Sequence, residues 1–199
     1  MVEGKAPEIT VDQARTLLKA VDVSHVVGLR DRAMLATLGY TACRAGAMAK
    51  LRLGDFQHDG SQYVLRFQEK GGKIREIPVR HDLEGFILAY VEVAGIAGDG
   101  KGKPLFRAGI NGMAKRLTGN APTSKRICEL VKRRLKDAGL PSRLSPHSFR
   151  VTAITDLLSQ EIPLKDVQYP AGHAEPRTTG PSDRPQKKVT RTIVERISI

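Results

Sequence analysis

The chain has 199 residues, which is enough for one domain with a sizeable core. It contains 33 Lys and Arg against 21 Asp and Glu, and the net charge of +12 favours a polyanionic partner such as nucleic acid. No apolar run approaches the ~20 residues of a spanning helix, and the N-terminus lacks the apolar centre of a secretory signal. We therefore expect a cytoplasmic protein with no membrane partner.

The two cysteines, Cys43 and Cys128, lie far apart, and neither has a second Cys or His at metal-ligand spacing. This pattern disfavours a disulfide framework and a zinc site, so each is expected to be a small buried apolar residue. Aromatic residues make up only 5% of the chain and Trp is absent, which disfavours a base-stacking surface for single strands. Duplex DNA is therefore the expected polyanion, and we expect no metal and no cofactor.

Three helices are predicted in the first 51 residues. Thr10 and Gln13 form a capping box in front of the first helix. A second helix is predicted over 30–42 and a short third helix over 45–51. The second helix has an apolar stripe of four residues: Met34, Leu35, Leu38 and Ala42.

Two strands are predicted next, over 63–67 and 74–79, and the charged, glycine-containing segment 68–73 between them is typical of a hairpin turn. Helical periodicity returns over 82–96. The glycine-rich segment 97–104 follows this helix, whereas a phosphate-binding loop follows a strand, so we interpret it as a connector.

A basic helix is predicted within 121–140, with Thr123 or Ser124 as its cap and Gly139 as its end. Such a run of charge is usually a solvated face, but here it agrees with the charge of the whole chain. Its six basic residues are Lys125, Arg126, Lys132, Arg133, Arg134 and Lys136.

The segment "SPHSFRVTAITDLL" (145–158) predicts a helix that begins with a Ser-Pro entry. His147 and Arg150 are three residues apart and therefore share a face, so an imidazole and a guanidinium could converge on one phosphate. The alternative is a capped surface helix with two unrelated polar residues.

The C-terminal part of the sequence predicts less regular structure. Pro163 could start a short helix, and 189–197 has the pattern of a final amphipathic helix. Between them, the two prolines and one glycine of 180–185 are incompatible with a continuous helix. The predicted architecture is mostly α with a small antiparallel β-sheet (α+β).

Four features occur in a fixed order: Arg44 after the second helix, Lys70 in the hairpin, "PHSFR" with its His-x-x-Arg, and "AGHAEPRTT" with His173. This order resembles the catalytic domain of the tyrosine recombinase (phage integrase) family, from about Pro7 to Ile199. The resemblance implies the DNA breaking-rejoining fold, one domain over 1–199, and no N-terminal DNA-clamping domain. It also implies site-specific DNA recombination and integration, with duplex DNA and other recombinase subunits as partners, by a bacterial or phage-encoded protein associated with the nucleoid.

The resemblance also assigns roles to residues. Arg44 and Arg150 would clamp the non-bridging oxygens of the scissile phosphate, because phosphoryl transfer gains mainly from positioning and charge stabilisation. Lys70 would protonate the leaving 5′-oxygen as a general acid. His147 and His173 would donate hydrogen bonds to the same phosphate.

Two of these assignments have alternatives, since His173 could be satisfied in the core and Lys70 could be merely solvated, with Lys73 as its rival. Further contacts with DNA are predicted for five basic residues: Lys73, Arg75, Lys125, Arg126 and Arg177.

The family places its tyrosine nucleophile nine residues after the Gly-His histidine, where this chain has Ser182. The flanking residues fix the register: Arg177, Thr178, Thr179, Asp183 and Arg184. A tyrosine phenol has a pKa of ~10, whereas a serine hydroxyl is far less acidic and shorter, so we expect a cleavage-deficient recombinase domain. The alternatives are a non-catalytic accessory or competitor of an intact recombinase, and an active strand transferase that uses Ser182, Tyr169 or a tyrosine from another subunit.

Overall fold

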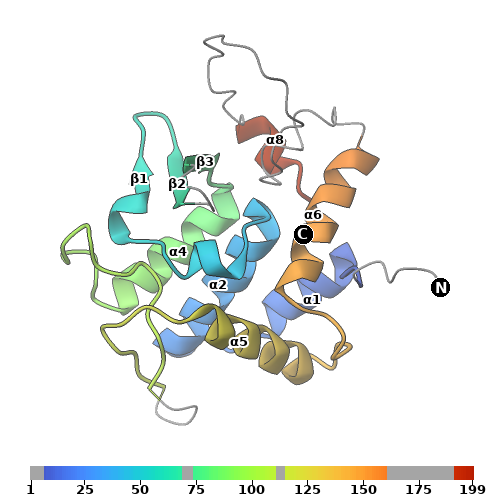
Figure 1. Cartoon of the computed structure of the whole chain (residues 1–199), viewed down its shortest axis with the longest axis horizontal. Coiled ribbons are helices and arrows are strands. Elements are labelled where there is room, and N and C mark those ends of the chain that lie inside the picture. Colours follow the sequence, from blue (N-terminus) through green and yellow to red (C-terminus); the bar gives the residue numbers. More distant parts are fainter. Residues whose placement is uncertain (1–6, 69–73, 111–114, 161–190) are drawn as a thin grey trace, which may run out of the picture.

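The computed structural model describes residues 7–68, 74–110, 115–160 and 191–199 (Figure 1). Seven α-helices and three strands lie in these ranges, so the prediction of a mostly helical chain with a small sheet is confirmed. The helices are α1 Val11–Ala20, α2 Val26–Thr41, α3 Ala45–Met48, α4 His81–Val93, α5 Ser124–Asp137, α6 Pro146–Ser159 and α8 Arg191–Glu195. No helix of the described ranges is long and apolar enough to cross a membrane.

The sheet is antiparallel and its strand order follows the chain: β1 Phe56–His58, β2 Tyr63–Gln68 and β3 Ile74–Pro78. Strands β2 and β3 are the predicted hairpin strands, and Leu65 pairs with Ile77 on the buried side. The sequence did not predict β1, because three residues are too few to establish an alternating pattern. A one-turn 3-10 helix, Leu53–Asp55, leads into β1.

Local side-chain contacts explain where the helices begin. The predicted capping box of α1 is confirmed: the Gln13 amide donates to Thr10 Oγ1 at 3.1 Å, and the Thr10 amide donates to Gln13 Oε1 at 3.0 Å. Helix α2 begins four residues before the predicted start, because Nδ1 of His25 accepts from the Gly28 amide at 3.0 Å. Thr123 is the N-cap of α5.

Helix α2 forms the centre of the molecule, with α4 and α6 packed against it (Figure 1). It is buried on nearly all sides, including the predicted stripe of Met34, Leu35 and Leu38. A helix that is surrounded in this way has no solvent face on which to place polar residues. Any charged residue of α2 therefore needs partners inside the protein, and Arg30 and Asp31 are both buried.

The C-terminal segment packs back onto this core. The Tyr40 hydroxyl donates to the Ile199 carbonyl at 2.8 Å, and Nη1 of Arg80 donates to the Ile197 carbonyl at 2.7 Å. Helix α8 is shorter than the predicted helix over 189–197. The predictions for Pro163 and for 180–185 lie outside the described residues.

The two cysteines differ in their surroundings. Cys43 is buried, as predicted, whereas Cys128 is half-buried, so the prediction of burial is wrong for Cys128. Cys128 lies on α5 beside the buried residue Ile127 but on the partly exposed side of the helix.

Candidate functional site

Three of the predicted site residues, Arg44, Arg75 and Arg150, lie at the C-terminal end of α2. The helix stops because Ala42 adopts the left-handed conformation, with φ 50° and ψ 26°. The last carbonyls of a helix have no partner within the helix and need donors from elsewhere. Here two arginines supply them.

Both arginines come from distant parts of the chain. Nη1 of Arg150, on α6, donates to the Ala42 carbonyl at 2.8 Å. Nη1 of Arg75, on β3, donates to the Thr41 carbonyl at 3.1 Å. Positive side chains are favoured at this negative end of the helix dipole. Arg150 is 5% exposed and Arg75 is 4% exposed, so both charges lie in the interior.

Arg44 lies two residues beyond Ala42 and is the N-cap of α3. Its carbonyl accepts from the amides of Ala47 and Met48 at 2.9 and 3.0 Å, which fixes its backbone, while its side chain is exposed. The chain thus turns sharply between α2 and α3 and places Arg44 beside the carbonyls that hold the two buried arginines. We call Arg44, Arg75 and Arg150 the helix-end cluster.

The predicted Ser-Pro entry to α6 is confirmed, since the helix begins at Pro146 and Ser145 forms a capping box with Ser148. His147 is exposed in the first turn, one turn before Arg150. The helical spacing places the two side chains on one side of α6, as the sequence predicts. Two guanidinium groups thus contact the end of α2, Arg44 follows it in the chain, and His147 lies one turn before Arg150 on α6.

Arg75 lies in the interior of the protein. Its guanidinium is buried, donates to the Thr41 carbonyl and lies 5.1 Å from the centre of the Phe67 ring, and its predicted contact with DNA remains a prediction. The alternation of side chains along β3 explains this burial, because Arg75 and Ile77 share the buried face of the strand. Arg75 therefore links the hairpin strands to the end of α2.

The other predicted DNA contacts within the described residues lie at the start of α5. Lys125 and Arg126 are exposed, and Nη1 of Arg126 lies 3.3 Å from Oε2 of Glu129. Arg126 also lines a pocket with His25, at the beginning of α2, so about 25 Å of helix separates this region from the helix-end cluster. The other predicted site residues lie outside the described residues: Lys70, Lys73, His173, Arg177 and Ser182.

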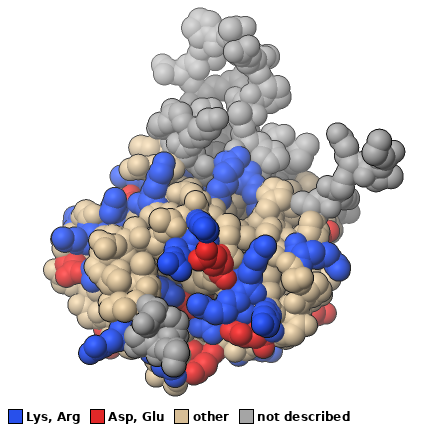
Figure 2. All heavy atoms as spheres, turned by 60° about the horizontal axis from the view of Figure 1, so that its bottom comes forward, with Lys and Arg blue, Asp and Glu red and all other residues tan. Residues whose placement is uncertain are grey.

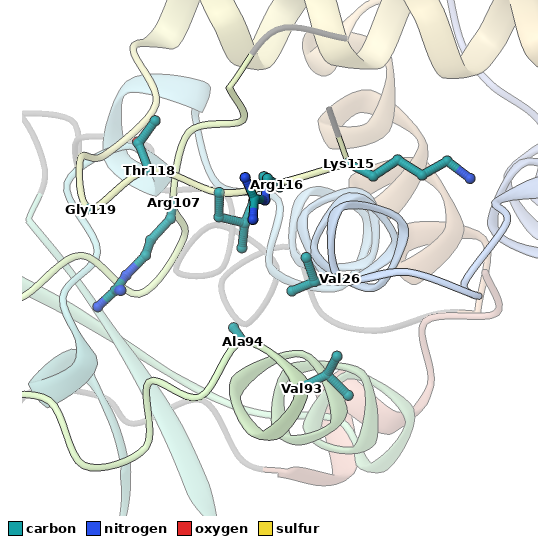
Figure 3. A pocket seen from close by; sticks show the side chains of 9 residues that line it. Val26, Val93, Ala94, Arg107, Lys115, Arg116, Thr118 and Gly119 are labelled. Carbon is teal, nitrogen blue, oxygen red and sulfur yellow. The ribbon is translucent and has the colours of Figure 1, made fainter. Parts of the chain in front are cut away.

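Figure 3 shows a second hollow, of about 370 Å³, which contains none of the predicted site residues. The aliphatic side chains of Val26 and Val93 lie on one side of it, and the chain segment that bears Arg116 and Thr118 lies on the other. Lys115 extends away from the rest of the lining. This hollow is shallow and basic, and it is separate from the helix-end cluster.

Asp31 has a structural role that was not predicted from the sequence. It is fully buried on α2 and receives hydrogen bonds from three arginines, two of them on α5. The sequence contained a sign of this burial, because Asp31 precedes Met34, Leu35 and Leu38 at helical spacing and therefore belongs to the same apolar stripe. A carboxylate on such a stripe requires paired charges.

Solved structures with the same architecture define the class of fold. The chain superposes with a TM-score of 0.69 on XerA recombinase, at 21% identity over 86% of this chain and 58% of the other. The integrase of mycobacterium phage Brujita gives 0.70 at 16% identity, covering 99% and 60%. The lambda integrase catalytic core gives 0.58 at 19% identity, covering 85% and 93%. The fold is that of a tyrosine recombinase catalytic domain, as the sequence predicts.

The chain belongs to the phage integrase family, whose model matches residues 7–181. Tyrosine recombinase XerC of Pelobacter propionicus is 29% identical over 171 residues, which cover 86% of this chain and 53% of that protein. Tyrosine recombinase XerD of Pseudomonas putida is 30% identical over 163 residues, covering 82% and 52%. The chain thus spans about half the length of these relatives.

Proposed function

We propose that this chain binds duplex DNA at a backbone phosphate and acts in site-specific recombination without cleaving a strand itself. The observation that supports this proposal best is the helix-end cluster, with His147 one turn before Arg150 on α6. Arginine has five N–H donors in a planar fork whose geometry matches phosphate, and the bond from Nη1 to the Ala42 carbonyl fixes the orientation of the Arg150 guanidinium. Burial strengthens such interactions because water is excluded.

The relatives favour DNA as the source of that phosphate. XerH recombinase, with a TM-score of 0.68 at 22% identity, was solved with its difH substrate. By analogy, Arg44 and Arg150 would bind the two non-bridging oxygens, and His147 would donate a third hydrogen bond. Lys70 would act as general acid and His173 as a further donor. We also propose that other recombinase subunits are partners of this chain.

The proposed lack of cleavage depends on Ser182. A tyrosine phenol has a pKa of ~10, whereas an aliphatic hydroxyl has a pKa close to that of water, ~16. The phenol therefore ionises about six orders of magnitude more readily. Serine is also shorter by an aromatic ring, and the sequence does not identify a base that would activate it. We therefore propose that the chain keeps the phosphate site and has lost the nucleophile.

Duplex titrations at two salt concentrations test the binding. We expect affinity to fall steeply with salt, by a factor that grows with each phosphate contacted. Arg44→Ala and Arg150→Ala should weaken binding more than Lys187→Ala, which removes an equal charge at a position with no proposed role. Equal losses in all three variants would contradict a defined phosphate site, and Arg44→Ala keeps the test valid if Arg150→Ala unfolds the protein.

Trapping of covalent adducts on nicked duplex tests the chemistry. The wild-type chain should form no adduct. Ser182→Tyr alone should restore little, because Pro181 and Pro185 flank the position, and a displacement of about 1 Å can cost ~100-fold in rate. Replacing Gly180 and Pro181 with helix-compatible residues in the Ser182→Tyr variant should restore more. An adduct with the wild-type chain would contradict the loss of the nucleophile and would favour an active transferase.

A further inference from the structure

We propose that the chain has a second phosphate site, in a pocket between the first half of α2, residues 108–110 and α5. This pocket has a volume of about 420 Å³, within the range of small-ligand sites, and we call it the Asp31 pocket. Five Lys and Arg side chains line it: Arg30, Lys115, Arg126, Arg133 and Arg134. About 18 Å of helix separates Arg30 from Ala42, so the pocket is distinct from the helix-end cluster.

The floor of the pocket has more positive than negative charge. Oδ1 of Asp31 accepts from Nε of Arg30 at 2.9 Å, and Oδ2 accepts from Nη2 of Arg134 at 2.7 Å and from Nη2 of Arg133 at 3.1 Å. One fully buried carboxylate thus serves three guanidinium groups. Two positive charges are left without a full counter-charge in a partly buried place, where screening by solvent is weak.

Carboxylates at the rim compensate only part of this excess. Glu129 pairs with Arg126 at 3.3 Å, and Asp137 pairs with Arg134 at 3.4 Å. Among the described residues of the lining and floor, five cations therefore face three carboxylates. Figure 2 brings the α5 side of the molecule forward and shows Lys and Arg gathered around a few acidic residues. An anion is the ligand that such a charge distribution favours.

Gly109 keeps the pocket open above the guanidinium of Arg30. A Cβ at this position would lie 3.3 Å from Nη1 and 3.9 Å from Nη2 of Arg30. Arg30 itself is fixed, because Nη1 donates to the Arg107 carbonyl at 2.8 Å and Nε is held by Asp31. The pocket thus has a buried, rigid arginine at its base and the half-exposed Arg133 at its side.

Planar guanidinium groups at fixed positions are typical of sites for phosphate, which accepts several charge-assisted hydrogen bonds at once. The phosphate could belong to the backbone of a bound duplex or to a small free compound. The chemistry of the site is the same in both cases.

Titration with inorganic phosphate at constant ionic strength, followed through backbone amide NMR shifts, tests the site in the full chain. We expect shifts at residues of the Asp31 pocket. Affinity should fall at least five-fold in Arg133→Ala, which removes a donor, and in Gly109→Ala, which fills the space and changes no charge. Lys132→Ala is the matched control, because it removes a charge from the exposed side of α5 and should change affinity less than two-fold.

Equal losses in Arg133→Ala and Lys132→Ala, with none in Gly109→Ala, would overturn the proposal, since affinity would then follow net charge alone. Thermal unfolding of each variant identifies any loss of phosphate affinity that comes from misfolding. Arg133→Ala and Gly109→Ala provide two independent tests of the site.

Titration of the same variants with duplex DNA identifies the source of the phosphate. Weaker duplex binding in Gly109→Ala would assign the site to the DNA backbone, whereas unchanged duplex binding would assign it to a small free phosphate. This inference goes beyond the proposed function and does not depend on it. A protein that binds inorganic phosphate in the Asp31 pocket but binds no duplex would contradict the proposed function alone.

Discussion

Ala42 determines the geometry of the helix-end cluster, because its left-handed backbone directs its carbonyl toward Arg150. Helices usually place glycine at this position, since a side chain in the left-handed region costs ~1–2 kcal/mol. The sequence did not predict this turn, because alanine itself favours helix continuation. The local strain is compensated by the hydrogen bonds of the two arginines.

We predict that Ala42→Gly is less destabilising than Ala36→Gly by about 1–2 kcal/mol. Both substitutions remove one buried methyl group and add the same freedom to the unfolded chain, but only Ala42 has a positive φ. Ala36 lies in the right-handed interior of α2 and is the matched control. Chemical denaturation measures both free energies of unfolding, and equal values would show that the turn stores no strain.

Arg150 also has a structural role that can be measured without DNA. Arg150→Ala should lower the free energy of unfolding by about 1–3 kcal/mol, because the buried Ala42 carbonyl would lose a donor. Arg44→Ala should change it by less than about 0.5 kcal/mol, since that side chain is exposed. If Arg150→Ala were as stable as wild type, the hydrogen bond to Ala42 would not hold the helix end.

At the scale of elements, the link between α2 and α5 depends on one carboxylate. The basic run on α5 suggested a solvated face, and this interpretation was incomplete, because Arg133 and Arg134 turn toward Asp31. Sequence periodicity predicted the helices and the hairpin well, because each has a repeating local pattern. It did not predict which charges pair across elements, because that pairing depends on how α2 and α5 pack.

We predict that Asp31→Asn lowers the free energy of unfolding by about 3–5 kcal/mol, because it leaves three arginines facing one another without a counter-charge. Asp137→Asn is the control on the same cluster. Asp137 is half exposed and 3.4 Å from Arg134, so its loss should cost less than about 1 kcal/mol. Similar costs for the two variants would mean that the buried pairs contribute no more than a surface pair.

At the scale of the whole molecule, the candidate site could be predicted only in part. The order of the basic residues pointed to Arg44, His147 and Arg150; Arg150 contacts the end of α2, Arg44 follows that end in the chain, and the roles of all three remain predictions. The strand and helix periods are compatible with burial of Arg75 and Asp31, but they do not identify the partners of these side chains, because long-range packing decides which groups meet. The stability of the core also depends on contacts between distant segments.

Tyr90 links α4 to the segment that follows it. It is fully buried on α4, stacks with Phe106 and accepts a hydrogen bond from the Arg107 amide at 3.2 Å. Burial raises the pKa of Tyr90 to about 12, although the hydrogen bond from Arg107 lowers it. An unfolded tyrosine has a pKa of ~10. Between pH 10 and pH 12 the folded protein keeps the Tyr90 proton that the unfolded chain has lost. The stabilisation that comes from the neutral, buried Tyr90 is therefore complete below pH 10 and is lost as the pH rises toward 12.

We predict that Tyr90→Phe makes the alkaline decline in stability shallower. Loss of one titrating proton should reduce the slope of the free energy of unfolding against pH by up to ~1.4 kcal/mol per pH unit between pH 10 and 12. Burial also raises the pKa of Tyr40, so part of the alkaline decline should remain in the variant.

Urea denaturation at several pH values measures the slopes. The comparison uses slopes because the variant also loses the acceptor for Arg107, which lowers its stability at every pH. Parallel curves for the two proteins would contradict the prediction that Tyr90 keeps its proton in the folded core.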